Sequence, residues 1–165
     1  MLQNIVVELI TSLVGIFFGM LAALAVDRYN EQRRRRLRAK IILKSLSQEL
    51  NENFNTLQQV RSAYVTTPFG KSFYVNTVAW ETAVASGELP AIIGDDLTDS
   101  ISDQYALLVR IRYYVDLLTR LWFAPANITG YEEIRHGFNQ QIVEAMNKAI
   151  NRHEPLLTMI GRVIK

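Results

Sequence analysis

Apolar residues gather near the start of the chain in one run without a charged side chain. The run Leu9–Val26 reads LITSLVGIFFGMLAALAV, contains 18 residues and has only Thr11 and Ser12 as polar members. An α-helix rises about 1.5 Å per residue, so the run covers roughly 27 Å, close to the hydrocarbon thickness of a bilayer. A core helix of a soluble protein normally carries a polar stripe, which this run lacks. The pattern predicts a membrane-spanning anchor over residues 1–26.

Positive charge follows this run and does not precede it. A cleaved signal peptide has basic residues before its apolar run and a small-residue cleavage site after it. Here the basic residues come afterwards, as Arg33, Arg34, Arg35, Arg36 and Arg38. Because cationic side chains stay on the cytoplasmic side of a membrane, we predict a single-pass protein of the inner (cytoplasmic) membrane. Its N-terminus would lie outside and its C-terminal domain in the cytosol.

The basic character of the chain is local. The sequence pI is about 9.0, yet residues 27–40 carry a net charge of +5 and residues 41–165 a net charge of −2. Arginines beside a span set topology and contact anionic lipid head groups, which is the role we predict for 27–40 as a juxtamembrane segment. A nucleic-acid-binding domain needs its basic surface on the folded body, so we expect no nucleic-acid partner.

Small residues recur at every fourth position of the predicted span. They are Thr11, Gly15, Gly19 and Ala23. Small side chains let two helix backbones approach closely, which matters because lipid supplies no hydrophobic drive for association. The pattern predicts a helix–helix association face, and therefore a homo-oligomer or a subunit of a membrane complex.

The segment after the arginines continues in helical periodicity. Apolar positions alternate in steps of three and four through Leu43, Leu46, Leu50, Asn53, Leu57, Val60 and Tyr64. Such spacing is typical of a coiled-coil seam, in which one polar residue such as Asn53 can fix register. Ile41, Ile42 and Phe54 widen the apolar face, which favours a helix packed inside a bundle. A coiled-coil seam and a bundle seam both remain open.

Later segments also predict helices. One is expected over residues 71–86 with Gly87 as its C-terminal cap, and another from an N-cap at Asp95 or Asp96 to a stop near Pro125. The last begins near Tyr131 and is kinked or restarted by Pro155. No segment alternates with period two. We predict an all-α protein in which one transmembrane helix continues into a cytosolic bundle of four to five helices over 41–165.

Candidate chemistry is sparse. The chain has no cysteine, and its two histidines, His136 and His153, are expected on the surface. Glu133 and His136 form a single ExxH pair without the second copy that a bundle metal site uses. The acids Asp95, Asp96, Asp99 and Asp103 fit the start of a helix, where negative charge is favourable. We expect no catalytic residue, no metal and no cofactor.

Four short stretches of sequence carry a resemblance. The span ends in GIFFGMLAALAVDRYNE, and LSQELNENF and then VAWETAVASGEL with DQYALL follow. These stretches resemble a widespread family of small bacterial membrane proteins of unknown function. The matching residues are Gly15, Ile16, Ala23, Leu24, Asp27, Tyr29, Asn30, Glu31, Glu49, Leu50, Asn53, Trp80, Glu81, Ser86, Gly87, Leu89 and Tyr105. The resemblance implies a single-pass anchor with a cytosolic helical domain, and it supplies no catalytic residue.

Two hypotheses about function follow. The first is a non-enzymatic, membrane-anchored interaction or accessory protein. It would self-associate through the Gly15/Gly19 face and the Leu43–Tyr64 seam, and dock a partner on its bundle. The alternative is an oligomeric membrane effector or channel-like protein whose bundle senses a small ligand. That hypothesis requires a basic pocket, for which the candidates are Arg110, Arg112 and Arg120.

Overall fold

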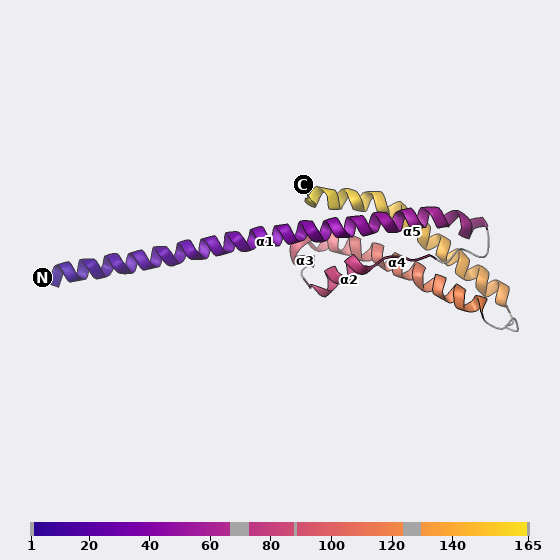
Figure 1. Ribbon diagram of the computed structural model, residues 1–165, viewed down its shortest axis with the longest axis horizontal. Coiled ribbons are helices and arrows are strands. Elements are labelled where there is room, and N and C mark those ends of the chain that lie inside the picture. Colours follow the sequence, from indigo (N-terminus) through magenta and orange to yellow (C-terminus); the bar gives the residue numbers. More distant parts are fainter. Residues whose placement is uncertain (1, 67–72, 88, 124–129, 165) are drawn as a thin grey trace. The chain divides into compact units, whose positions relative to one another are not determined.

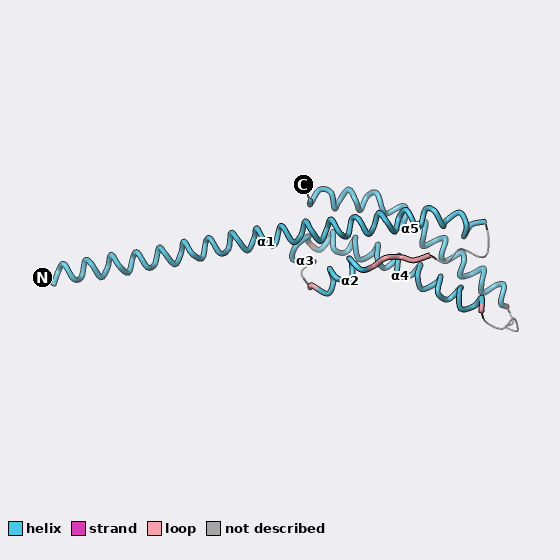
Figure 2. Tube along the Cα trace, viewed as in Figure 1, coloured by secondary structure: helices cyan, strands magenta, loops and turns pink. Residues whose placement is uncertain are grey.

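The part of the protein that the structure describes is almost entirely helical. The computed structural model describes residues 2–66, 73–87, 89–123 and 130–164, and these contain no strand. The helices are α1 (Leu2–Thr66), α2 (Val78–Ala85), α3 (Leu89–Ile93), α4 (Asp95–Trp122) and α5 (Tyr131–Ile164) (Figures 1 and 2). The all-α prediction is confirmed.

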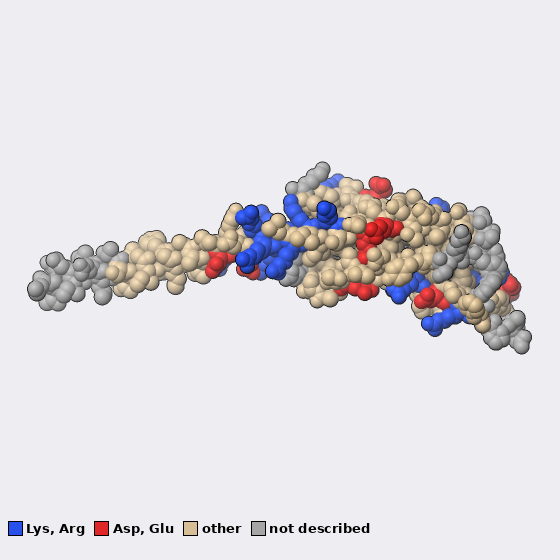
Figure 3. Space-filling view, viewed as in Figure 1, with Lys and Arg blue, Asp and Glu red and all other residues tan. Residues whose placement is uncertain are grey.

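The chain divides into two compact units within α1, between Arg38 and Ala39. In the first unit the side chains from Ser12 to Arg38 are exposed. Figure 3 shows the stretch without charge there, followed by the arginines. By length and composition α1 can cross a membrane. Within the juxtamembrane segment, residues 27–40, Arg35 forms an ion pair with Glu31 at 2.6 Å.

In the second unit, α1, α4 and α5 pack around one apolar core, and each contributes a row at helical spacing. Each fully buried leucine or isoleucine in such a core contributes about 2 kcal/mol. The core rows are Leu43, Leu46, Leu50, Leu57 and Tyr64 from α1, Leu97, Ile101, Tyr105, Leu108, Ile111 and Val115 from α4, and Ile142, Ala145, Met146, Ala149, Leu156 and Ile160 from α5. Val60 is partly buried against this core. The predicted seam residues therefore lie inside the chain's own core, so they are not available to a second copy in the folded protein.

The helix predicted over 71–86 is wrong at its start. Residues 71 and 72 lie outside the described part, residues 73–77 are not helical, and α2 begins only at Val78. The reason is tertiary, because the backbone N–H and C=O of Asn76 bond to the side chain of Asn53. The other end agrees better with the sequence: Gly87 follows α2 with φ 65°, and its N–H donates to the carbonyl of Val84.

The connector before α4 also differs from the sequence prediction. It contains the five-residue helix α3, with Pro90 in its first turn, where a missing N–H costs no helix bond. Asp95 and Asp96 are the first helical residues of α4, and Gly94 is the N-cap residue, with φ 81°. Glycine tolerates this positive φ, so the chain can pass from α3 straight into α4.

Pro155 does not interrupt the last helix. It lies inside α5, which continues as one helix to Ile164. The proline removes one backbone donor, but the helix retains its apolar row on both sides of it, at Ala149 and Leu156.

Candidate functional site

The carboxylate of Glu49 lies beneath the first turn of α2. Glu49 is only 4% exposed. Its two oxygens accept hydrogen bonds from the N–H of Ala79 at 2.7 Å and of Trp80 at 3.3 Å. These N–H groups have no partner within a helix, so Glu49 on α1 caps α2 from outside. Thr77, the N-cap residue, makes no side-chain cap bond and donates its hydroxyl to Glu81 instead.

Asn53 fixes the chain just before α2. Its Oδ1 accepts from the N–H of Asn76 at 2.8 Å, and its Nδ2 donates to the carbonyl of Asn76 at 2.7 Å. Asn53 is 3% exposed. Both ends of its amide thus serve a contact within one chain, whereas the sequence suggested a register role between copies.

Tyr105 of α4 joins the cluster that Glu49 and Asn53 of α1 form with the start of α2. The hydroxyl of Tyr105 on α4 donates to Glu49 Oε1 at 2.6 Å, and its ring stacks on Trp80 with centroids 4.9 Å apart. Burial raises the pKa of Tyr105, and the hydrogen bond and charge of Glu49 raise it further, so the hydroxyl remains a donor. Four of the residues that carry the family resemblance, Glu49, Asn53, Trp80 and Tyr105, thus meet at one place.

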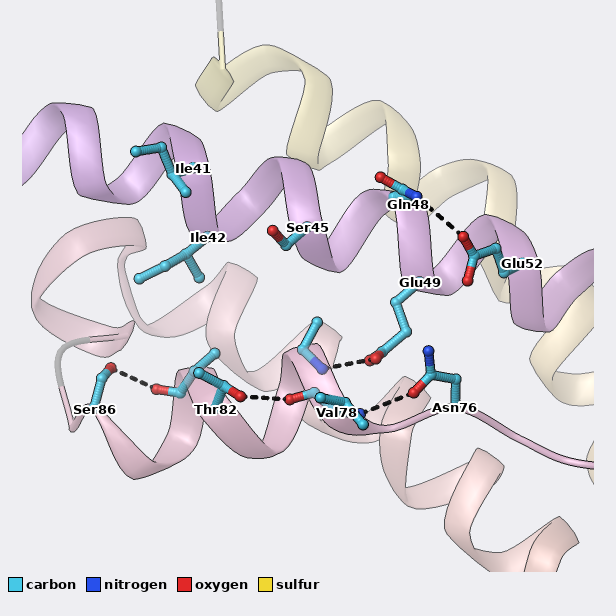
Figure 4. A pocket seen from close by; sticks show the side chains of 12 residues that line it. Ile41, Ile42, Ser45, Gln48, Glu49, Glu52, Asn76, Val78, Thr82 and Ser86 are labelled. Atoms are coloured by element: carbon cyan, nitrogen blue, oxygen red, sulfur yellow. Dashed lines mark hydrogen bonds between the residues drawn. The ribbon is translucent and has the colours of Figure 1, made fainter.

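A groove lies between α1 and the segment that this cluster holds. It has a volume of about 460 Å³ and is lined by Ile41, Ile42, Ser45, Gln48, Glu49, Glu52, Asn76, Val78, Ala79, Thr82, Ala83 and Ser86. Figure 4 shows Ile41 to Glu52 along one wall and Val78, Thr82 and Ser86 along the other. The α1 wall is apolar at Ile41 and Ile42 and polar from Ser45 to Glu52, while on the facing wall Thr82 and Ser86 lie toward the isoleucines and Val78 lies beside Asn76.

The charge of this groove is negative. Among the residues that the structure describes, Glu49 and Glu52 are its charged lining residues, and no lysine or arginine lines it. The carboxylate of Glu49 already accepts hydrogen bonds from Ala79, Trp80 and Tyr105. The carboxylate of Glu52 is exposed and accepts one hydrogen bond, from Gln48 Nε2 at 3.1 Å. Large apolar side chains stand open at its rim, with Ile41 67% and Val78 59% exposed. The groove can therefore receive apolar groups that are accompanied by a cation.

His153 is buried, contrary to the sequence expectation. It is 2% exposed, stacks on Phe54 at 4.0 Å between ring centroids, and its Nε2 lies 3.1 Å from Asn51 Oδ1. Burial lowers the pKa of His153, an effect that the nearby charge of Glu154 opposes. His136, by contrast, is exposed beside Gln140.

The acidic residues do not assemble a cation site. Asp103 on α4 forms an ion pair with Arg152 on α5 at 3.1 Å. Among the described residues, no three side chains of histidine, cysteine, aspartate or glutamate group as a metal would require.

The remaining predicted residues lie outside the groove. Arg112 stands over the ring of Tyr74 at 5.9 Å, and none of Arg110, Arg112 and Arg120 lines the groove. In the first unit, a Cβ added at Gly15 or Gly19 would meet no atom within 4 Å. Ala23 and the arginines of residues 33–36 are exposed, and the side chain of Thr11 lies outside the described part.

No family model, curated protein or solved structure matches the chain. The family resemblance therefore stays a prediction.

Proposed function

We propose that this protein is a single-pass, non-enzymatic interaction protein of the cytoplasmic membrane that docks a partner in the groove between α1 and α2. The observation that carries the proposal is that one helix, α1, supplies both an exposed apolar run and one wall of a preformed groove. The groove would face the cytosol.

The exposed apolar run supports the anchor. Ile16 and Phe18 are 68% and 64% exposed, whereas the second unit buries its own apolar rows. A contiguous apolar surface of this kind is costly in water and favourable in lipid. The arginines after it would hold the second unit on the cytoplasmic side and contact anionic lipid head groups.

The rigidity of the groove supports docking. The side chains of Glu49 and Asn53 tie the α2 wall to α1 through four hydrogen bonds to backbone groups of residues 76–80. A wall that is already ordered costs a partner less entropy on binding than one that must fold around it. Self-association would use the Gly15/Gly19 face, because the Leu43–Tyr64 seam is buried in the core.

The groove can be blocked without touching the core. Ser45 is exposed on the α1 wall, and Ser45→Trp would fill the groove. Gln58 is exposed on the same helix outside the groove, so Gln58→Trp is the matched control. The full-length wild type and both variants would be purified from native membranes in mild detergent and their masses measured. We expect a stoichiometric second protein with wild type and Gln58→Trp that is lost with Ser45→Trp. The same associated proteins with all three, or none with any, would overturn the proposal.

A further inference from the structure

We infer that the partner presents an amphipathic helix bearing a lysine or arginine that pairs with Glu52. The inference rests on the proposed docking function and names the chemistry of its partner. Along α1 the groove extends from Ile41 to Glu52, a distance of about 17 Å at the rise of an α-helix. This is the length of about three helical turns, which place apolar anchors at i, i+3, i+4 and i+7 along one face.

The polarity of the α1 wall orients such a helix. Its apolar anchors would contact Ile41 and Ile42 at one end and Val78 nearer the middle of the groove, and its polar end would reach Gln48 and Glu52. Glu52 is the charge open to a partner, because Glu49 already accepts three hydrogen bonds within the chain. Gln48 holds the Glu52 carboxylate by a hydrogen bond, which leaves its remaining lone pairs for a cation.

The same charges argue against two other occupants. An anionic lipid head group would meet Glu52, and no lysine or arginine of the described part of the chain lines the groove to balance it. A second copy anchored in the same membrane would lie parallel, and a two-fold contact through the groove would bring the Glu52 side chains of both copies together. Like charges placed opposite each other disfavour a contact, whereas a cationic partner removes the repulsion.

The test uses the full-length protein in nanodiscs and a phage-displayed library of helical peptides of about 14 residues, with apolar anchors fixed at i, i+3, i+4 and i+7. The affinities of the selected peptides are then measured by fluorescence anisotropy. We expect selected peptides to share a lysine or arginine at one position. Glu52→Gln should weaken their binding about fivefold, the upper range for a single exposed ion pair. Glu154→Gln, which removes an exposed carboxylate on α5, should leave binding unchanged.

The outcomes separate the two proposals. Selected peptides without a shared cation, or with equal affinity for wild type and Glu52→Gln, would overturn the cationic partner. If Ser45→Trp still abolished their binding, the docking groove would stand. Peptides that bind Ser45→Trp as tightly as wild type would overturn the groove as the docking site. A library that yields no binder would overturn the helical partner.

Discussion

Two polar side chains on the buried face of α1 decide where α2 begins. Glu49 and Asn53 lie one turn apart, and both bond to backbone groups of residues 76–80. Hydrogen bonds to a charged acceptor contribute about 1.5–3 kcal/mol, more than neutral ones. Removing either side chain would leave buried backbone groups without a hydrogen-bond partner. These residues therefore determine where α2 begins and also stabilise the fold.

Asn53→Leu should destabilise the protein by about 2 kcal/mol, because the N–H and C=O of Asn76 lose their partners. Urea unfolding of the full-length protein in detergent, followed by tryptophan fluorescence, measures the change. Asn55→Leu, the same substitution at an exposed position of α1, should change the free energy of unfolding by less than about 0.5 kcal/mol. A more stable Asn53→Leu with additional oligomeric states would restore the coiled-coil interpretation.

His153 should make stability depend on pH. Because burial lowers its pKa in the folded protein, the unfolded chain binds the proton more readily. The stability contribution is complete above the unfolded pKa of about 6.5, falls as pH drops below that value, and levels off below the folded pKa. The slope in this window is at most about 1.4 kcal/mol per pH unit. Urea midpoints measured across this range should show that slope in wild type.

His153→Gln removes the titrating ring and should reduce this slope, while its amide can still donate to Asn51. His136→Gln, at the exposed histidine, should retain the wild-type profile. Equal pH profiles for wild type and His153→Gln would show that burial of His153 does not govern the acid sensitivity.

At the scale of elements, long periodic segments could be predicted well, α2 only as the later part of a longer predicted helix over 71–86, and α3 not at all. α4 and α5 each repeat apolar residues over several turns, which is sufficient to identify them. α2 and α3 have eight and five residues, too few for a periodic signal. The start of α2 follows from contacts with α1 that are distant in sequence, such as Glu49 with Ala79.

The site left partial signals in the sequence. His153 continues the apolar row of α5, four residues after Ala149 and three before Leu156, so its burial could have been predicted from spacing. Glu49 likewise follows Leu46 by three residues, which places a charge on a buried face. Spacing could not identify their partners, because Asn51, Ala79 and Tyr105 approach them only in the folded chain.

Two glycines provide a test of how the elements are joined. Gly94 has φ 81° and ψ 159°, a region that is essentially restricted to glycine, whereas Gly137 lies inside α5. A Cβ would have open space at both positions. Gly94→Ala should therefore cost about 2 kcal/mol through backbone strain, and Gly137→Ala should gain about 0.5–1 kcal/mol through helix propensity. Thermal unfolding measured by circular dichroism should show a lower midpoint temperature for Gly94→Ala and a higher one for Gly137→Ala. Equal shifts of the midpoint in the two variants would contradict this account.

At the scale of the whole molecule, the two units use apolar residues in opposite ways. The second unit covers its apolar rows with its own helices, while the first exposes residues such as Phe17 and Phe18. The charge differs along the chain as well, with a net +5 over residues 27–40 and −2 over residues 41–165. This distribution suits the proposed function, in which the first unit is anchored in lipid and the groove of the second unit binds a cationic partner.

Association of the predicted span can be separated from folding of the second unit. Gly15→Ile and Gly19→Ile together should weaken self-association in a membrane reporter assay, because larger side chains keep two backbones apart. They should leave unfolding of the second unit unchanged, since a Cβ at either position meets no atom of the chain within 4 Å. Ala25→Ile, a small-to-large change about 120° around the helix from Gly19, is the matched control and should retain association. If the glycine variants associate like wild type, the Gly15/Gly19 face does not pair spans; if Ala25→Ile weakens association equally, bulk in the span rather than this face controls it.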